Sequence, residues 1–292
     1  MNIGSIAVIG FGEAAQAFVV GMPGKLISYD RKIETVHERA DKLADGQRLG
    51  VTMAGSNGEA VAEAGVILSL VTADQAEQAA RATAASLRPG AFYFDMNSVA
   101  PDTKRLSAEV VENQGGLYVD VAVMAPVHPG RRAVPLLVSG PHAQEGARQL
   151  REVGFDMVRV IGDTVGAASA VKMIRSIMVK GIEALSAECA MAAKLSGVLD
   201  EVISSLDTSW PSADWVARFD YNLDRMLVHG LRRSEEMDEV VKTIEGLGMR
   251  APMSRGTAER QREIGGFRLA PPQGLDSKLE QLGTLLSHRD NG

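Results

Sequence analysis

The first half of the chain alternates short apolar runs with stretches of helical spacing. Five runs rich in β-branched residues have the length of strands: residues 5–10, 25–30, 51–55, 66–71 and 91–95. Between them, residues 33–46 and 74–87 carry Ala, Glu, Gln and Leu at helical spacing, so each can form a right-handed crossover to a parallel neighbour. This order predicts an α/β fold with a doubly wound, mainly parallel sheet covered on both faces.

The pattern changes in the second half. Three more apolar runs follow, at residues 117–123, 134–139 and 155–161. After Gly162 the chain is rich in Ala, Met, Leu, Glu and Lys at helical spacing, with few β-branched runs. We therefore expect two domains, residues 1–162 with the sheet and residues 163–292 with helices only.

Helix start and stop signals divide the second domain further. A long helix is expected to begin near Gly166 and to run beyond Leu195. Residues 210–214 predict a break followed by an N-capped helix. Gly246-Leu247-Gly248, followed by Pro252, predicts another stop.

Composition narrows the possible functions. The 292 residues are 45% hydrophobic, enough for a substantial core, and the net charge of -6 argues against nonspecific nucleic-acid binding. No apolar run approaches the roughly 18 residues that span a bilayer, and the first residues lack the features of a signal peptide. The single cysteine, Cys189, excludes an intramolecular disulfide and fits a reducing cytoplasm; we expect a packed, inert thiol.

The clearest chemical motif joins the first predicted strand to the first helix. Its residues are Gly10, Phe11, Gly12, Glu13, Ala14 and Ala15. Gly10 allows a sharp turn, Gly12 allows a pyrophosphate to approach the backbone, and Ala15 allows close packing of helix on strand. The motif predicts a Rossmann-type dinucleotide-binding domain, here followed by an all-α domain, because the free N–H groups of that helix face the phosphates.

A carboxylate supports this interpretation. Asp30 ends the second predicted strand, about 20 residues after Gly10, where the fingerprint places an acid for the adenosine ribose. The alternatives are a helix N-cap and a solvated loop acid. Asp30 favours NAD because it repels a 2′-phosphate, whereas Arg31 beside it is able to hold the extra phosphate of NADP.

Three further segments carry small and polar residues, 95–101, 120–126 and 162–172. With the glycine turn, they resemble, in order, the β-hydroxyacid dehydrogenases, which include 3-hydroxyisobutyrate and 6-phosphogluconate dehydrogenases. The resemblance implies a polar loop near the nicotinamide, a substrate loop and a glycine-rich approach to a helix with a catalytic lysine. We expect Val71, Thr72 and Asn97 at the cofactor, and Asn97 and Ser98 at the substrate.

Lys172 is the catalytic residue that the resemblance implies. Alcohol oxidation needs a base for the hydroxyl proton, and a lysine serves if desolvation lowers its pKa. The apolar neighbours of Lys172 fit this role, although they also fit an ammonium that reaches out to water. Ser176, one turn later, stands where the family commonly has asparagine, and Lys180 follows as either a carboxylate ligand or a solvated residue.

The chain also departs from the family pattern. Met124-Ala125-Pro126 replaces the Ser-Gly-Gly that grips a carboxylate in much of the family, so we expect Met124 to contact the substrate in a more apolar setting. Val179 stands where the decarboxylating phosphogluconate enzymes have a glutamate acid. These differences predict simple dehydrogenation, with either a different mode of carboxylate recognition or a substrate that is more apolar at this point.

A basic segment in the second domain completes the predicted site. His229 and Arg232 are candidates to bind a carboxylate or phosphate. For Arg233 we favour a solvated helix position, with a dimer interface as another reading. Together with Met124 and Lys172, the segment is more similar to a phosphogluconate-dehydrogenase-like branch than to the hydroxyisobutyrate enzymes. No histidine or carboxylate spacing predicts a metal site.

The sequence thus predicts a cytoplasmic NAD(P)-dependent dehydrogenase that oxidises the CH–OH group of a small hydroxyacid, with Lys172 as acid and base. Two alternatives remain open: an imine reductase on the same fold, and a dinucleotide-binding regulator without turnover. The resemblance implies a homodimer, and neither a nucleic acid nor a membrane is an expected partner.

Overall fold

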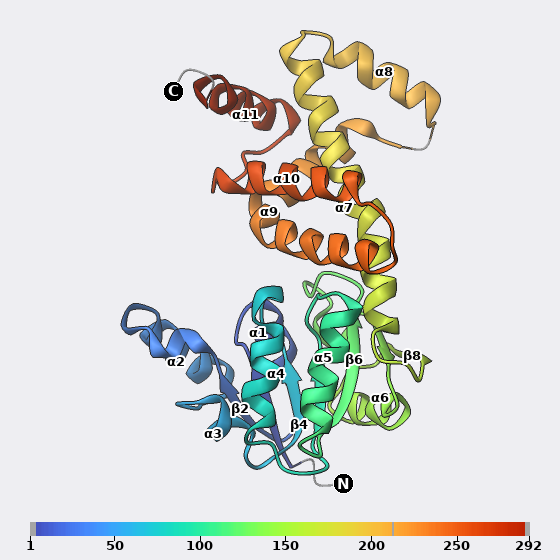
Figure 1. Cartoon of the computed structure of the whole chain (residues 1–292). Coiled ribbons are helices and arrows are strands. Elements are labelled where there is room, and N and C mark those ends of the chain that lie inside the picture. Colours follow the sequence, from blue (N-terminus) through green and yellow to red (C-terminus); the bar gives the residue numbers. More distant parts are fainter. Residues whose placement is uncertain (1–3, 212, 290–292) are drawn as a thin grey trace. The chain divides into compact units, whose positions relative to one another are not determined.

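The computed structural model describes residues 4–211 and 213–289. Its contacts divide the chain into two compact units, the first ending at Ile174 and the second beginning at Arg175. Figure 1 shows that strands lie in the first unit and that the second is helical.

The described part of the first unit is built on an eight-stranded sheet in the order β3-β2-β1-β4-β5-β6-β7-β8. Every predicted apolar run overlaps one strand. The strands are β1 (Ser5–Ile9), β2 (Lys25–Tyr29), β3 (Thr52–Met53), β4 (Ala64–Ser69), β5 (Phe92–Asp95), β6 (Leu117–Val123), β7 (Leu136–Ser139) and β8 (Val158–Gly162). All neighbours pair in parallel except β6 and β7, which are antiparallel. The predicted doubly wound sheet is confirmed.

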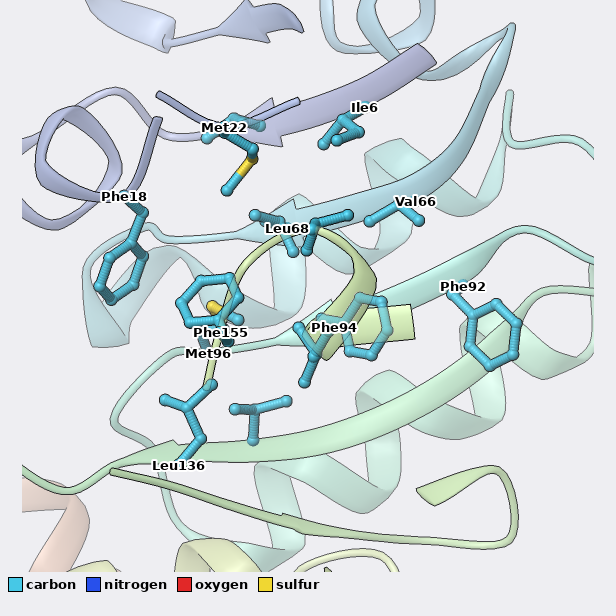
Figure 2. Close-up of a cluster of buried hydrophobic side chains, with 14 of the residues drawn as sticks. Ile6, Phe18, Met22, Val66, Leu68, Phe92, Phe94, Met96, Leu136 and Phe155 are labelled. Carbon is cyan, nitrogen blue, oxygen red and sulfur yellow. The ribbon is translucent and has the colours of Figure 1, made fainter. Parts of the chain in front are cut away.

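Helices cover both faces of this sheet because the strands are apolar on both sides. Alternate strand residues such as Phe92 and Phe94 pack into one core with α1 (Glu13–Val19) and α6 (Ala143–Glu152). In Figure 2, Phe18 and Phe155 lie within this core. Their rings pack edge to face, with 5.0 Å between the ring centroids.

The other face carries a second core. Its residues include Tyr93 and Tyr118, and it is covered by the helices α3 (Asn57–Val61), α4 (Ala76–Ala84) and α5 (Pro101–Glu112). The helical spacing predicted at 33–46 and 74–87 corresponds to α2 and α4, each preceded by a short 3-10 turn. The turn η1 (Arg31–Glu34) precedes α2 (Val36–Leu49), and η2 (Ala73–Gln75) precedes α4. A third turn, η3 (Arg131–Ala133), lies between β6 and β7.

The second unit is helical, as predicted. Its elements are the later part of α7 (Ala167–Leu195), then α8 (Leu199–Ser209), α9 (Trp215–Gly246), α10 (Pro252–Gly266) and α11 (Leu275–Arg289). Asp214 caps α9 by accepting a hydrogen bond from the backbone N of Ala217 at 2.9 Å, as the break at 210–214 predicts. Ser212 of that predicted break lies outside the described residues.

Close backbone packing joins α9 to α10. A Cβ on Gly230 would lie 2.5 Å from the carbonyl oxygen of Gln261, and a Cβ on Gly265 would lie 2.5 Å from the backbone N of Leu231. Only glycine fits at these crossing points, because the opposing atoms belong to the backbone. The two helices are therefore held together by main-chain contact as well as by side chains.

The contact division falls inside α7, whereas the sequence places the domain boundary at Gly162. The reason lies in the start of this helix: the backbone N–H groups of Gly166 and Ser169 donate to Asp120 at 3.0 and 3.1 Å. The first turns of α7 consequently belong to the sheet unit. Farther along the same helix, Cys189 is exposed, so the prediction of a packed thiol is wrong.

Candidate active site

The turn between β1 and α1 has the backbone that the glycine motif predicts. Gly10 has φ 85°, and a Cβ there would lie 2.5 Å from the carbonyl oxygen of Leu70. A side chain is therefore excluded by both conformation and space. Ala15, three residues beyond Gly12, is fully buried against the sheet.

Gly12 differs from Gly10 in a way that matters for ligands. It caps α1 with φ −86°, and a Cβ there would meet no protein atom within 4 Å. As a glycine, it has no side chain that could cap the helix, and the first turn begins with Glu13 and Ala14. An open space beside a helix start fits the pyrophosphate of a dinucleotide.

Asp30 holds this turn in place. Its Oδ2 accepts from the backbone N of Phe11 at 2.7 Å, and its Oδ1 accepts from the backbone N of Lys32 at 3.0 Å. The second contact caps η1, so the alternative of a helix N-cap is realised together with contact to the glycine turn. The Phe11 side chain is buried, and Arg31 is exposed.

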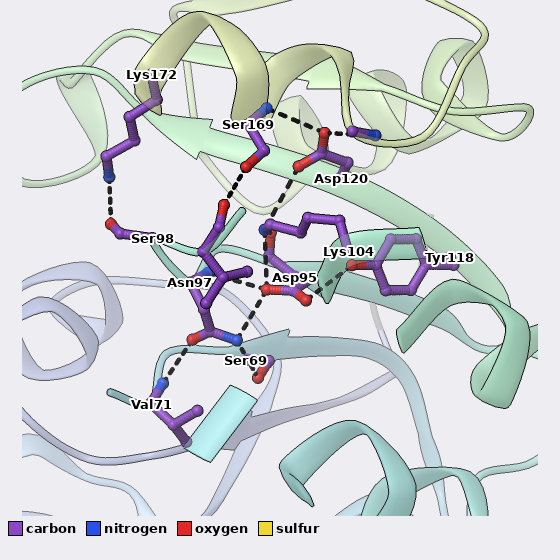
Figure 3. A network of polar contacts seen from close by, with 12 residues as sticks. Ser69, Val71, Asp95, Asn97, Ser98, Lys104, Tyr118, Asp120, Ser169 and Lys172 are labelled. Carbon is purple, nitrogen blue, oxygen red and sulfur yellow. Dashed lines mark hydrogen bonds and ion pairs between the residues drawn. The ribbon is translucent and has the colours of Figure 1, made fainter. Parts of the chain in front are cut away.

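Polar groups at the carboxyl ends of β4 and β5 lie beside each other (Figure 3). Asn97 accepts from the backbone N of Val71 at 2.7 Å and donates to Ser69 and Asp95 at 3.0 and 2.8 Å. Both of its amide protons are therefore used within the protein, and its side chain anchors the loops. Thr72 is exposed, and its hydroxyl donates to Asp74 at 2.5 Å, which lowers the pKa of that carboxyl.

Lys172 and Ser98 meet in the first unit. The lysine Nζ donates to the serine Oγ at 2.6 Å, although the residues are 74 positions apart in sequence (Figure 3). Both side chains are partly buried. An amine and a hydroxyl at the carboxyl end of the sheet can together exchange a proton with a reacting group.

A buried cluster behind this pair was not predicted from the sequence. Lys104 on α5 lies 2.9 Å from Asp95 and 3.4 Å from Asp120, with all three side chains fully buried. Tyr118 donates to Asp95 at 2.7 Å. A signal was present, because Lys104 lies on the same helical face as the buried Ser107, Ala108 and Val111.

Met124 lies at the end of β6, where its backbone N donates to Pro135 at 2.9 Å. It lines an open pocket of about 460 Å³ in the first unit. The pocket wall is mainly apolar, with Leu137, Met157 and Val171 among its residues. The side chains around Met124 are mainly apolar, and its contact with a substrate stays a prediction.

Comparison with known proteins identifies the first unit. Residues 5–153 match the family described as the NAD binding domain of 6-phosphogluconate dehydrogenase. The chain belongs to this family. Membership makes the first unit an NAD-binding domain and places the chain among the NAD(P)-dependent oxidoreductases.

Solved structures agree with this assignment. The chain is 36% identical to a conserved hypothetical protein from Sinorhizobium meliloti 1021, with 97% and 96% of the two chains covered and a TM-score of 0.74. It is 26% identical to a conserved protein of unknown function described as structurally similar to 3-hydroxyacid dehydrogenases. The match covers 90% of this chain and 98% of that chain, with a TM-score of 0.68. A Mycobacterium tuberculosis 3-hydroxyisobutyrate dehydrogenase shares the fold, at 17% identity, 95% and 98% coverage and a TM-score of 0.72.

The second unit of this 6-phosphogluconate dehydrogenase-type chain carries its own polar residues. Residues 193–264 match a domain of unknown function, DUF1932. The buried Lys180 pairs with Glu236 at 2.7 Å and donates to the buried Ser176 at 3.5 Å, so the alternative of a solvated Lys180 is wrong. Of the predicted residues on α9, His229 is half-buried and Arg232 is exposed.

Arg233 departs from expectation. It is buried and pairs with Glu183, which also accepts from Gln261 at 3.0 Å. The prediction of a solvated Arg233 is therefore wrong, because Glu183 of α7 supplies a partner that the sequence of α9 alone does not reveal.

Within residues 4–211 and 213–289, no group of three or more His, Cys, Asp or Glu side chains is placed to hold a metal ion. No helix in the same ranges combines the length and apolar character needed to cross a bilayer.

Proposed function

We propose that this chain is an NAD-dependent dehydrogenase that oxidises the CH–OH group of a small hydroxyacid, with Lys172 as general base and acid. The contact of Lys172 with Ser98 at 2.6 Å carries this proposal. It brings an amine to the carboxyl end of a sheet whose first turn has the features of a dinucleotide site. The family match supports the cofactor class.

The residues that would hold the dinucleotide are those of the glycine turn and the neighbouring strand ends. Backbone N–H groups after Gly12 would receive the pyrophosphate, and Asp30 would receive the adenosine ribose. Val71 and Thr72 would lie on the side of the nicotinamide ring. When bound, oxidised nicotinamide supplies the hydride acceptor.

Lys172 would handle the proton. In the oxidising direction its neutral amine takes the hydroxyl proton of the substrate while hydride leaves the same carbon, and a carbonyl forms. In the reducing direction the ammonium returns that proton. Ser98 holds the lysine Nζ by its hydroxyl, which restricts where the amine can point. Asn97 contributes by fixing the loop that carries Ser98.

Substrate recognition is proposed to differ from that of Ser-Gly-Gly enzymes. Met124 offers an apolar wall, and Ser176, Lys180, His229 and Arg232 remain candidates for polar contacts. The pair between Lys180 and Glu236 neutralises the ammonium, which disfavours Lys180 as a direct carboxylate ligand. Arg232 is exposed and stays a candidate for the acid group, because guanidinium binds carboxylates in a bidentate manner.

We propose NAD rather than NADP as the preferred cofactor. The Asp30 carboxylate faces the turn through Phe11 and would repel a 2′-phosphate. Arg31 is the residue that opposes this preference. Titrating the protein separately with NADH and NADPH tests the choice, and tighter binding of NADPH would reverse it.

Replacing Lys172 tests the catalytic role. Lys172→Met should lower kcat by about a hundredfold or more, while dinucleotide affinity stays within about twofold, because only the proton-transfer group is lost. Lys194→Met is the matched control, since Lys194 lies in the last turn of the same helix and pairs with Asp276. Near-normal turnover of Lys172→Met on the true substrate would refute the assignment.

The choice of substrate panel separates the competing reactions. Turnover of hydroxyacids without turnover of cyclic imines supports the dehydrogenase, and the opposite result supports an imine reductase. Dinucleotide binding without any turnover on a broad panel would favour a regulator.

We also propose that the chain forms a homodimer in the cytoplasm. Val171, Ile174, Met178 and Leu185 of α7 are each exposed apolar residues, and exposed apolar side chains are commonly buried by association. Light scattering that finds only monomer would contradict the dimer.

A further inference from the structure

Lys104 is a buried cation that the proposed reaction leaves unused. Its Nζ lies 2.6 Å from the carbonyl oxygen of Asp95, 2.9 Å from Oδ1 of Asp95 and 3.4 Å from Oδ1 of Asp120. One ammonium thus serves two fully buried carboxylates. A buried ion cluster of this kind is seldom more stabilising than packed apolar residues of similar volume, which suggests that it has a role in fixing geometry.

One side of the cluster fixes the loop that carries Ser98. Oδ1 of Asp95 accepts from the backbone N of Asn97 at 3.0 Å and from its side-chain Nδ2 at 2.8 Å. Oδ2 of the same carboxylate accepts from the Tyr118 hydroxyl at 2.7 Å. The position of Asp95 consequently sets the turn immediately before Ser98.

The other side fixes the start of the helix that carries Lys172. Oδ2 of Asp120 accepts from the backbone N of Gly166 and Ser169 and from the Ser139 hydroxyl, at 3.0, 3.1 and 3.0 Å. Oδ1 of Asp120 has no hydrogen bond among the described residues, so its close counter-charge is Lys104. Lys172 follows Ser169 by one helical turn.

We propose that Lys104 is a positioning residue for the pair formed by Ser98 and Lys172. It acts on them through Asp95 and Asp120. By holding Asp95 and Asp120 together, it joins the loop after β5 to the first turn of α7, and these two segments end at the atoms that meet at 2.6 Å (Figure 3). The inference rests on the proposed role of Lys172.

Chemical labelling of the Lys172 amine tests this proposal without a known substrate. The full chain is acetylated with acetic anhydride over a range of pH, and modification of Lys172 is followed by peptide mass spectrometry. In Lys104→Met, the labelling rate of Lys172 should rise by about fivefold or more, as expected when a hydrogen bond to a charged group loosens.

The matched control is another buried lysine held by two aspartates. Lys278 lies 2.6 Å from Asp220 and 2.9 Å from Asp224, in the second unit. Lys278→Met should leave the labelling of Lys172 unchanged even if it lowers the melting temperature. A purely structural role for Lys104 predicts that the two variants behave alike, and an unchanged or lower labelling rate in folded Lys104→Met overturns the proposal.

A milder variant covers the case in which Lys104→Met does not fold. Asp120→Asn keeps the shape of the side chain and removes its charge, and it should also raise the labelling rate of Lys172; no rise overturns the proposal. Titration with NADH and NADPH distinguishes failure of the proposed function from failure of the positioning role of Lys104. Failure of wild-type protein to bind either dinucleotide refutes the proposed function, but it leaves the labelling comparison valid.

Discussion

Two glycines of a single turn illustrate how differently one residue type is used. Gly10 is required by the protein itself, since its φ of 85° and the carbonyl oxygen of Leu70 leave no room for a side chain. Gly12 has an ordinary φ and open space, so the protein alone does not require glycine there. The need for glycine at position 12 is explained if a ligand approaches the backbone.

Alanine substitutions separate these two requirements. Gly10→Ala should lower the free energy of unfolding by about 2 kcal/mol or more, because it combines left-handed backbone with a clash. Gly12→Ala should change it by less than about 0.5 kcal/mol and weaken dinucleotide binding about tenfold or more. Urea unfolding and calorimetric titration measure the two effects. Equal loss of stability in both variants would show that Gly12 is structural.

Among single residues, the sequence predicted those whose roles follow from local spacing. Gly10 and Asp30 come from a motif with fixed separation, and the helix of Lys172 follows a recognisable lead-in. Lys104 was missed because a lysine in an amphipathic helix is usually solvated, and its partners Asp95 and Asp120 lie on two separate strands. Arg233 was misjudged for the same reason.

Among the elements, α9 and α10 depend on glycine at their crossing. Gly265→Ala should destabilise the protein by about 1–3 kcal/mol, because its Cβ would lie 2.5 Å from the backbone N of Leu231. Gly256→Ala is the matched control on the same helix: with no atom within 4 Å, it should stabilise by about 0.5–1 kcal/mol through helix propensity. If denaturant unfolding finds Gly265→Ala more stable than Gly256→Ala, the close packing of α9 on α10 is contradicted.

The positions of strands and helices were predictable, because buried strands are continuous apolar runs and helices have apolar residues at helical spacing. Strand direction was less accessible. β6 pairs with β7 in the antiparallel direction because residues 124–135 between them contain only the short η3 and no crossover helix, whereas the other neighbouring strands pair in parallel. The hydrogen bonds that anchor α7 to Asp120 could not be predicted either, since apolar periodicity does not indicate hydrogen bonds between residues far apart in the sequence.

For the whole molecule, the buried Tyr93 and Tyr118 and the partly buried Tyr29 make stability depend on pH in the alkaline range. Burial and Glu34 raise the pKa of Tyr29 from 10.0 to about 12, and burial raises the pKa values of Tyr93 and Tyr118. The unfolded chain therefore releases these protons first as pH rises. The stability that they contribute is fully present below pH 10 and is lost as the pH increases above it.

Tyr221→Phe makes this dependence measurable, because it removes the exposed fourth tyrosine. Tyrosinate absorbance in this variant should rise together with loss of the native circular dichroism signal. Absorbance that rises near pH 10 in protein that is still fully folded would contradict the raised pKa values of these three tyrosines.

Isothermal titration calorimetry of the intact chain with NADH and with NADPH addresses the dinucleotide site itself. We expect at least one of them to bind with a dissociation constant in about the micromolar to millimolar range. Binding should be strongly reduced in Gly12→Ala. Absence of heat with both dinucleotides, from protein whose circular dichroism shows it to be folded, would contradict the assignment of a nicotinamide-dependent enzyme.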